Sequence, residues 1–333
     1  MTQKRMTGVM SALGSVLAVG EGTEVVVITD NESLGAGRRF FDSARALGAD
    51  ARLYVLPAER PLKEIPRELL GLISGYGKDN QNLVFINAFS GIAGETPIRV
   101  ALVAQEKSTG ARVGHAPGIE ERMMTGGAMD IDYRALAAAA RKLIARFEGA
   151  RSVDIKSPSG TDITLDIEGR GFVSDVEIPN ATMGNLPAGE VWCAPVEDGA
   201  SGVIVCDRSI GDLGAVVKPL KLTVKAGRLT GISGGTPALI RELKPLLDVD
   251  ESARVMGELG IGLNPGAKVT GNLLEDEKAG ETAHIAFGYN RDMPGGRNSS
   301  KTHRDFLFLR PTIEITFQDG QKVQVIKDGK LII

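Results

Sequence analysis

Between residues 24 and 147, short runs of β-branched residues alternate regularly with stretches of helical periodicity. The strand-like runs are 25–28, 53–55 and 83–86, and the helix-like stretches are 36–47, 65–74, 98–107 and 132–147. Strands and helices in alternation are typical of βαβ units, whose strands lie side by side in a parallel sheet. We therefore predict an α/β domain with a parallel sheet over residues 1–149.

After Gly149 the pattern changes to short strands of alternating polarity that are separated by glycine and proline. The expected strands are 152–156, 162–167, 203–206, 216–224 and 312–317, and one helix is expected at 237–247. Glycine is abundant, with 42 in 333 residues, or about 13% against roughly 7% in average proteins, which favours tight turns. The pattern predicts a β-rich α+β domain over residues 150–333.

The amino terminus superficially resembles a secretory leader, because a basic pair at residues 4–5 precedes a mostly apolar stretch at 6–19. The apolar residues nevertheless have helical spacing. One face comprises Met6, Val9, Met10, Leu13, Val16 and Leu17, and the opposite face comprises Thr7, Gly8, Ser11, Gly14 and Ser15. This pattern predicts an amphipathic helix packed on a core. No stretch reaches the roughly 18 to 20 apolar residues of a membrane span, so no membrane partner is expected.

The charge balance and the cysteine content narrow the class of protein. The chain has 39 Lys and Arg against 42 Asp and Glu, a net charge of −3, and no long basic block. A nucleic-acid partner is therefore not expected. Cys193 and Cys206 are the two cysteines of the sequence, which is neither a disulfide framework nor a thiolate metal site. A reducing, cytoplasmic location is expected.

A nucleotide site in the first domain is not expected. Residues 29–31 follow the first predicted strand, where a doubly wound sheet presents its ligands. However, the Gly-Ala-Gly at 35–37 is not the dinucleotide-binding fingerprint, and the GxxxxGK[ST] motif is absent from the sequence. We interpret the first domain as a scaffold that shapes a cleft.

Residues capable of metal chemistry gather in the last third of the chain. His303 and Asp305 are separated by one residue, so on an extended strand they lie on one face and can bind one ion. His284 comes 19 residues earlier, and carboxylates precede it at Glu258 and at 275–277. Imidazole with carboxylate is the ligand set of zinc, cobalt, manganese or iron(II), whereas calcium prefers oxygen ligands alone. Taken alone, the pattern is more typical of a surface histidine beside an aspartate and of an acidic, solvated turn than of a metal site.

Four segments in the same order resemble the aminopeptidase T family of metallo-aminopeptidases. Residues 185–191 (NLPAGEV) are similar to the family's N-L-P-x-x-E-V segment, and 257–259 (GEL) resemble its G-E-hydrophobic segment. Residues 276–288 look like its D-E…H-L-A-L-G segment, and 298–306 like its N-x-S…H-x-D-F segment. The resemblance covers residues 185–306.

This resemblance implies a metal site with named ligands. Enzymes of the family bind two divalent ions, and the cofactor expected here is zinc, cobalt or manganese. The implied ligands are Glu190, Glu258, Glu277, His284, His303 and Asp305. Glu277 stands seven residues before His284, a longer gap than in the family pattern. Tyr289 is a candidate for polarising the tetrahedral intermediate, and it lies closer to His284 than the family's tyrosine does.

The implied function is metal-dependent hydrolysis of an N-terminal peptide bond or a related amide, by a homodimer. In such a site two ions roughly 3.5 to 4 Å apart activate a water molecule, which attacks the carbonyl carbon. Glu258 or Glu277 would then carry the proton to the leaving amine. The expected substrate is a small peptide or amide.

Two other functions compete with hydrolysis. The iron(II)-dependent 2,5-dihydroxypyridine 5,6-dioxygenases look like distant members of the same fold, with a similar H-x-D and a histidine where this chain has Glu258. His284, His303 and Asp305 could form the facial triad of such a ring-cleaving dioxygenase. We favour hydrolysis, because the additional carboxylates Glu190 and Glu258 suit a two-metal hydrolytic site better. The third possibility is a binding protein that keeps the ligands without turnover.

Overall fold

The computed structural model describes residues 8–332, which form two compact units. The first unit comprises the described chain up to Ala137 together with the later segment Asp175–Ala188. The second unit comprises Ala138–Ser174 and the chain from Gly189 onward. The predicted fold class is confirmed, because a parallel sheet is followed by two large, mainly antiparallel sheets. The domain boundary at residues 149 and 150 remains a prediction, and the compact units differ from it at Ala137 and at 175–188.

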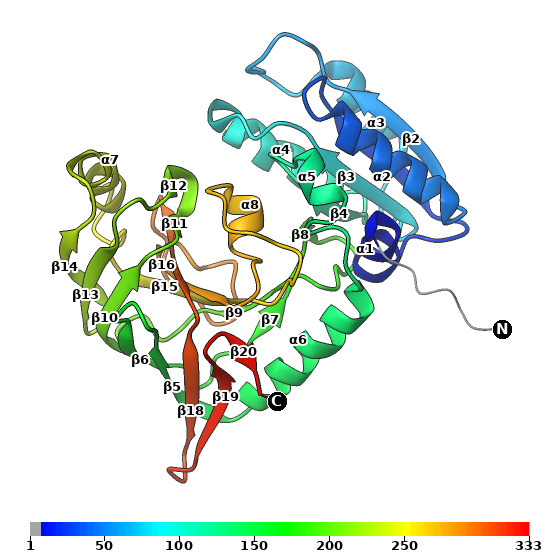
Figure 1. The fold of residues 1–333 in the computed structure, drawn as a ribbon. Helices are drawn as coiled ribbons and strands as arrows, with labels where there is room; N and C mark the ends of the chain where they lie inside the picture. The colour runs from blue at the N-terminus through cyan, green and yellow to red at the C-terminus, as the bar shows by residue number, and fades with distance from the viewer. Residues whose placement is uncertain (1–7, 333) are drawn as a thin grey trace. The chain divides into compact units, whose positions relative to one another are not determined.

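The first unit contains a five-stranded sheet with the order β2-β1-β3-β4-β8, and every neighbouring pair is parallel (Figure 1). The strands are β1 (Glu24–Thr29), β2 (Asp50–Val55), β3 (Leu83–Ala88), β4 (Arg112–His115) and β8 (Met183–Asn185). Sequence analysis missed β4 and β8. Both are short and contain glycine, so neither has the β-branched run that identifies the other strands.

Helices cover both faces of this sheet. They are α1 (Gly8–Val16), α2 (Leu34–Ala46), α3 (Arg67–Gly75), α4 (Thr96–Lys107) and α5 (Glu121–Met124), with a 3-10 turn η1 at Ala93–Glu95. The side chains of α3 and α4 pack with Val26, Ile28 and Phe85 in one buried cluster. Alternate strand residues such as Val25 and Val27 are equally buried on the other face, where α2 contacts β1 and β2. This two-sided burial explains why the central strands β1 and β3 are mainly apolar, whereas the edge strand β2 is partly exposed and carries Asp50 and Arg52.

The amphipathic helix predicted near the amino terminus is present as α1, and its apolar residues Val9, Leu13 and Val16 are buried. Met6 lies outside the described residues. The assignment of Ser11 to the exposed face is wrong, because Ser11 is 1% exposed. Its hydroxyl accepts a hydrogen bond from the backbone N–H of Tyr133, which makes its burial tolerable.

The second unit contains an eight-stranded sheet with the order β14-β13-β10-β6-β5-β18-β19-β20. Its strands are β5 (Ala150–Lys156), β6 (Asp162–Asp166), β10 (Ala200–Cys206), β13 (Leu220–Lys225), β14 (Arg228–Gly234), β18 (Thr312–Phe317), β19 (Lys322–Lys327) and β20 (Lys330–Leu331). The strand predicted over 216–224 begins later, at Leu220, since Pro219 has no N–H to donate to a ladder. Two helices, α6 (Tyr133–Phe147) and α7 (Pro237–Leu247), match their predicted ranges within one residue.

A second sheet of this unit, here called sheet C, has the order β12-β11-β17-β16-β15-β9-β7. Its strands are β7 (Val173–Ser174), β9 (Glu190–Cys193), β11 (Ser209–Ile210), β12 (Gly214–Ala215), β15 (Met256–Gly262), β16 (Thr282–Gly288) and β17 (His303–Leu309); short turns α8 (Leu273–Asp276) and η2 (Gly211–Leu213) lie between strands in the sequence. β15 and β16 are buried at every position. Polar side chains on these strands therefore need partners inside the protein.

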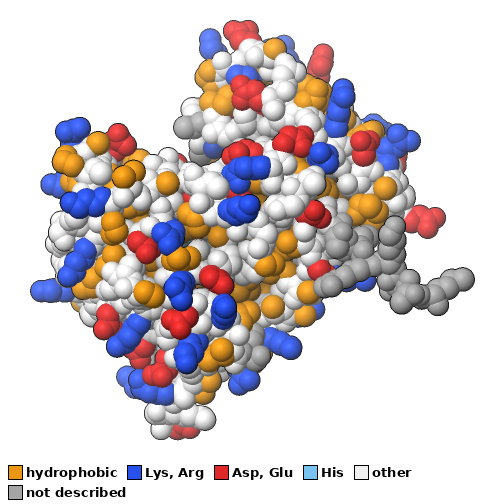
Figure 2. All heavy atoms as spheres, viewed as in Figure 1, with side chains coloured by type: hydrophobic (Ala, Val, Ile, Leu, Met, Phe, Trp, Pro, Cys, Tyr) orange, Lys and Arg blue, Asp and Glu red, His pale blue; other side chains and the backbone are white. Residues whose placement is uncertain are grey.

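Within residues 8–332, no helix combines the length and the apolar character needed to cross a membrane. Figure 2 shows Lys and Arg side chains mixed with Asp and Glu over the face in view. This mixture is consistent with the small net charge of −3.

Candidate metal centre

Three neighbouring strands of sheet C bring most of the candidate residues together. Glu258 on β15 lies opposite Ala286 on β16, and Ala286 lies opposite Asp305 on β17. His284 is two residues from Ala286, and His303 is two residues from Asp305. Because strand side chains repeat every two residues, all four polar side chains emerge on one face of the sheet. The H-x-D spacing had predicted this for His303 and Asp305.

Glu190 reaches the same face from β9, the neighbour of β15 on the other side. It lies opposite Gly262, which is four residues from Glu258 and therefore faces the same way. Gly260 lies opposite His284, and a Cβ at residue 260 would stand 2.0 Å from Nε2 of that histidine. Glycine is required at this position, because the imidazole occupies the space of any side chain.

The five side chains form two groups of donor atoms that share Glu258. In the His303 group, Nε2 of His303 lies 3.0 Å from Oε2 of Glu258 and 3.2 Å from Oδ1 of Asp305. In the His284 group, Nε2 of His284 lies 3.5 Å from Oε1 of Glu258 and 3.6 Å from Oε2 of Glu190. Each oxygen of Glu258 thus faces a different histidine, so this carboxylate belongs to both donor groups.

The electrostatics of this cluster favour positive charge. Burial acts to lower the pKa of His284, but the hydrogen bond and charge of Glu258, with the charges of Glu190 and Asp305, outweigh it and raise this pKa to about 9. The pKa of His303 is likewise well above its usual value, since Asp305 and Glu258 overcome the effect of burial. In the metal-free protein the imidazoles therefore hold protons where a cation would bind, and metal binding must displace them.

The donor set fits a divalent ion. Ligand atoms around a tetrahedral zinc ion with bonds of about 2.0 to 2.1 Å stand about 3.3 Å apart, and the four distances here are 3.0, 3.2, 3.5 and 3.6 Å. Mixed imidazole and carboxylate ligands suit zinc, cobalt, manganese or iron(II). Glu190, Glu258, His284 and Asp305 are all less than a tenth exposed, so the carboxylates need positive charge beside them, which a bound cation would supply in place of the imidazole protons.

A family model for the thermophilic metalloproteases (M29) matches residues 132–331, which include all five residues of the cluster. The chain belongs to the M29 family. Curated relatives include "Aminopeptidase T" of Thermus aquaticus, 30% identical over 52% of this chain, and "Aminopeptidase AmpS" of Bacillus subtilis, 26% identical over 51%. This chain spans about half the length of these relatives, since each alignment covers 47% of the relative.

Two solved structures share the fold over nearly the whole chain. Wild-type AmpT from Thermus thermophilus matches with a TM-score of 0.68 at 18% identity, covering 97% of this chain and 98% of AmpT. The 2,5-dihydroxypyridine dioxygenase from Pseudomonas putida matches with the same TM-score at 19% identity, covering 97% and 96% of the two chains. At these identities the matches establish the fold alone.

Two residues implied by the family resemblance lie outside both donor groups. Glu277 follows α8, and its carboxylate accepts a hydrogen bond from the buried ammonium of Lys278. Tyr289 follows β16 with 36% of its surface exposed. Its main-chain carbonyl accepts a hydrogen bond from Nδ1 of His303 at 2.7 Å. The assignments of Glu277 as a ligand and of the Tyr289 phenol as a catalytic group stay predictions.

The interpretation of 275–277 as a solvated turn is wrong. Glu275 and Asp276 are at most 1% exposed. Oε1 of Glu275 accepts a hydrogen bond from the N–H of Lys268 at 3.0 Å, and Asp276 accepts hydrogen bonds from the N–H groups of Thr270 and Gly271. These carboxylates hold the loop 268–272 against α8, and Lys278 follows directly at a buried position.

Lys278 is the most important residue that sequence analysis missed. Its side chain is 0% exposed, and Nζ donates a hydrogen bond to Oε1 of Glu190 at 2.6 Å. Its charge also helps to hold the pKa of Asp305 low. No sequence signal marks it, because a lysine beside a carboxylate is ordinary in a chain with 24% charged residues.

A second set of missed residues positions the loop between β16 and β17. Oε1 of Glu197 accepts hydrogen bonds from Nδ2 of Asn290 and from the N–H of Arg297. Asn290 also donates to the carbonyl of Gly257, next to Glu258 in the sequence, and accepts from the N–H of Asn298 at 2.7 Å. This network connects the loop that precedes His303 to the strand that carries Glu258.

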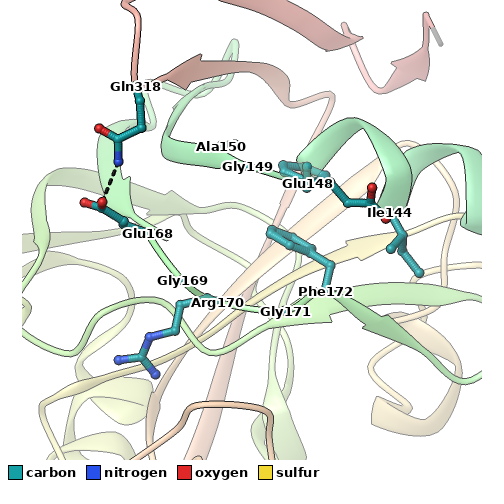
Figure 3. A pocket seen from close by; sticks show the side chains of 11 residues that line it. Ile144, Glu148, Gly149, Ala150, Glu168, Gly169, Arg170, Gly171, Phe172 and Gln318 are labelled. Carbon is teal, nitrogen blue, oxygen red and sulfur yellow. Dashed lines mark hydrogen bonds between the residues drawn. The ribbon is translucent and has the colours of Figure 1, made fainter.

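A cavity of about 440 Å³ lies elsewhere in the second unit, and no member of the two donor groups lines it. Phe172 stacks on Phe147 at this cavity, with ring centroids 3.9 Å apart. Figure 3 shows the hydrogen bond between Gln318 and Glu168 at its edge. Arg170 also lines the cavity and pairs with Glu197 at 2.7 Å, so it supports the network described above.

Proposed function

We propose that this protein is a metal-dependent hydrolase that cleaves the N-terminal bond of small peptides or related amides. Its membership of the M29 family and the names of its relatives as aminopeptidases support this proposal. The observation that carries it is the position of Glu258, whose two oxygens face two separate histidines. A carboxylate in this position can join two divalent ions, and zinc, cobalt or manganese fits the ligand set.

The residues of the chain supply binding and proton transfer. Glu190, Glu258 and His284 would hold one ion, and Glu258, His303 and Asp305 the other. When bound, divalent ions lower the pKa of a water and polarise the scissile carbonyl. A carboxylate that is not fully used in coordination, Glu258 or Glu277, would take up the water proton and deliver it to the leaving amine. A carboxylate of the cluster that binds the free α-ammonium of a peptide would confine cleavage to the first residue.

The dioxygenase alternative receives support from the shared fold with the 2,5-dihydroxypyridine dioxygenase. It requires His284, His303 and Asp305 to act as one triad. Among the described residues, His284 groups instead with Glu190 and Glu258, while His303 and Asp305 group with Glu258. The surplus of carboxylates favours hydrolysis.

Location and assembly belong to the same proposal. Cys193 and Cys206 are buried and free, which suits a reducing cytoplasm. The family resemblance implies a homodimer, and light scattering on the purified protein would measure its mass directly.

Replacing Glu258 by Gln tests the proposed function. Metal content is measured by mass spectrometry, and aminoacyl-anilide hydrolysis is measured with zinc, cobalt or manganese added back after chelation. Mutation of even an outer-shell partner of a metal ligand typically lowers metal affinity or activity 10- to 100-fold. We therefore expect loss of this shared ligand to reduce hydrolysis at least about 100-fold. Glu314→Gln, which alters an exposed carboxylate on β18, is the matched control and should keep full activity.

Other outcomes of this experiment would support one of the two competing functions. A single bound iron, with oxygen uptake on dihydroxylated aromatics that survives Glu258→Gln, would replace the hydrolase proposal by the dioxygenase. Metal binding without turnover of either substrate class, before and after the substitution, would indicate a binding protein.

A further inference from the structure

The His284 group differs from the His303 group because a buried ammonium borders it. Nζ of Lys278 donates hydrogen bonds to Oε1 of Glu190, at 2.6 Å, and to Glu277. The ammonium is completely buried. One oxygen of Glu190 is therefore engaged by a cation, and its other oxygen, Oε2, faces His284 at 3.6 Å.

The two histidines also differ in how they are held. Nδ1–H of His303 donates to the carbonyl of Tyr289 at 2.7 Å, which orients Nε2 toward Glu258 and Asp305. Nδ1 of His284 is buried and has no hydrogen-bond partner among residues 8–332. A hydrogen bond at the second ring nitrogen fixes the tautomer and raises the basicity of a ligating histidine. Only the His303 group has this support.

We propose that Lys278 makes the two metal positions unequal, so that the His303 group holds the tightly bound ion and the His284 group holds a weak, exchangeable one. A fixed positive charge beside Glu190 repels a dication and competes with it for the carboxylate. This inference rests on the proposed metal site and adds an order of binding to it. The chain therefore places an ammonium of its own beside one of the carboxylates that would hold the second ion.

Metal titration of the wild-type protein is the first test. Chelated protein is dialysed against increasing cobalt or zinc, and bound metal per chain is measured by mass spectrometry, independently of activity. We expect one equivalent to bind at least about tenfold more tightly than the second, in line with the effect of outer-shell groups on metal affinity. Two equivalents of equal affinity would overturn the inference.

Removal of the ammonium is the second test. In Lys278→Met the second equivalent should tighten at least about tenfold while the first changes less than about threefold. Lys225→Met, which removes an exposed ammonium on β13, is the matched control and should bind metal as the wild type does. An unchanged second equivalent in Lys278→Met would refute the role of the lysine.

Two further variants keep the test informative if Lys278→Met does not fold. Glu277→Gln removes one of the two carboxylates to which the Lys278 ammonium donates and leaves the other, Glu190. The ammonium should then compete more strongly for Glu190, so the second metal equivalent should bind more weakly than in the wild type. Asp305→Asn should abolish the tight equivalent, and loss of the weak one instead would contradict the assignment. A wild-type protein that binds no divalent metal would refute the proposed function itself, which is a different result from two equal sites.

Discussion

Glu106 is predicted to hold a proton at neutral pH and to make the first unit less stable as the pH rises. Its side chain on α4 is 0% exposed. Oε2 accepts a hydrogen bond from Nδ2 of Asn87 at 2.9 Å, while Oε1 has no hydrogen-bond partner among the described residues. Burial raises the pKa of Glu106 from 4.5 to about 8, although the Asn87 hydrogen bond acts in the opposite direction. Burial also lowers the pKa of nearby His115 to about 4, so this imidazole supplies no positive charge.

The sign of the pH effect follows from the two states. Below pH 4.5 the Glu106 carboxyl is protonated in the folded and the unfolded chain. Between pH 4.5 and about 8 the unfolded chain releases this proton while the folded protein keeps it, so stability falls by up to about 1.4 kcal/mol per pH unit. Over the whole interval the loss is roughly 5 kcal/mol. Above about pH 8 the folded protein also releases the proton and the effect ends.

Glu106→Gln removes this titration and keeps the shape of the side chain. The amide cannot ionise, but its NH₂ replaces an oxygen that has no partner, which costs roughly 1 to 3 kcal/mol at every pH. We therefore expect the variant to be less stable than the wild type at pH 4.5 and more stable by about 2 to 4 kcal/mol at pH 8.

Amide hydrogen exchange of β1 reports the stability of this unit, because the strand is its buried centre. Exchange is compared between pH 5 and 8.5 for the wild type, for Glu106→Gln and for Glu68→Gln, whose side chain on α3 is exposed. Infrared difference spectra should show a protonated carboxyl group at pH 7 that is lost only in Glu106→Gln. Equal pH dependence in all three proteins would refute the reasoning.

Two further substitutions test buried polar contacts in the two units. Arg60→Met should lower the free energy of unfolding of the first unit by about 3 to 5 kcal/mol. The reason is that Asp30 and Glu95 are at most 4% exposed and both pair with this guanidinium. Arg39→Met, at a site where the arginine is 50% exposed, should cost less than about 1 kcal/mol, and equal losses by calorimetry would contradict the argument. Asn298→Ala removes the side-chain amide that donates hydrogen bonds to the main-chain carbonyls of Ser252 and Gly288. We therefore expect the free energy of unfolding of the second unit to fall by about 2 kcal/mol. An unchanged melting temperature would show that water replaces these bonds.

Much of the fold could be predicted from local periodicity. The apolar runs at β1 and β3 and the helical stretches at α2 and α4 were predicted within a few residues, because each pattern reflects burial of one element against a core. The placement of His303 and Asp305 on one face could also be predicted from the local sequence, since it depends only on the two-residue repeat of a strand. Motif order added Glu190, Glu258 and His284 as candidate ligands.

Contacts between residues far apart in the sequence were beyond such patterns. β8 pairs with β4 about 70 residues away in the sequence, and nothing in Met183–Asn185 indicates its partner. Ser11 was assigned to the exposed face, whereas the N–H of Tyr133 makes its burial possible. Burial of a polar group depends on its partner, and the partner is decided by the fold.

The same distinction applies to the metal centre. The sequence by itself determined which residue types could bind a metal and which two share a strand face, because those properties depend on chemistry and on neighbours along one strand. The tertiary structure decided that the oxygens of Glu258 face different histidines and that Lys278 reaches Glu190, 88 residues away. These contacts depend on strand order in sheet C and on the buried turn after α8. Such an arrangement is set by packing of the whole unit, which no local pattern records.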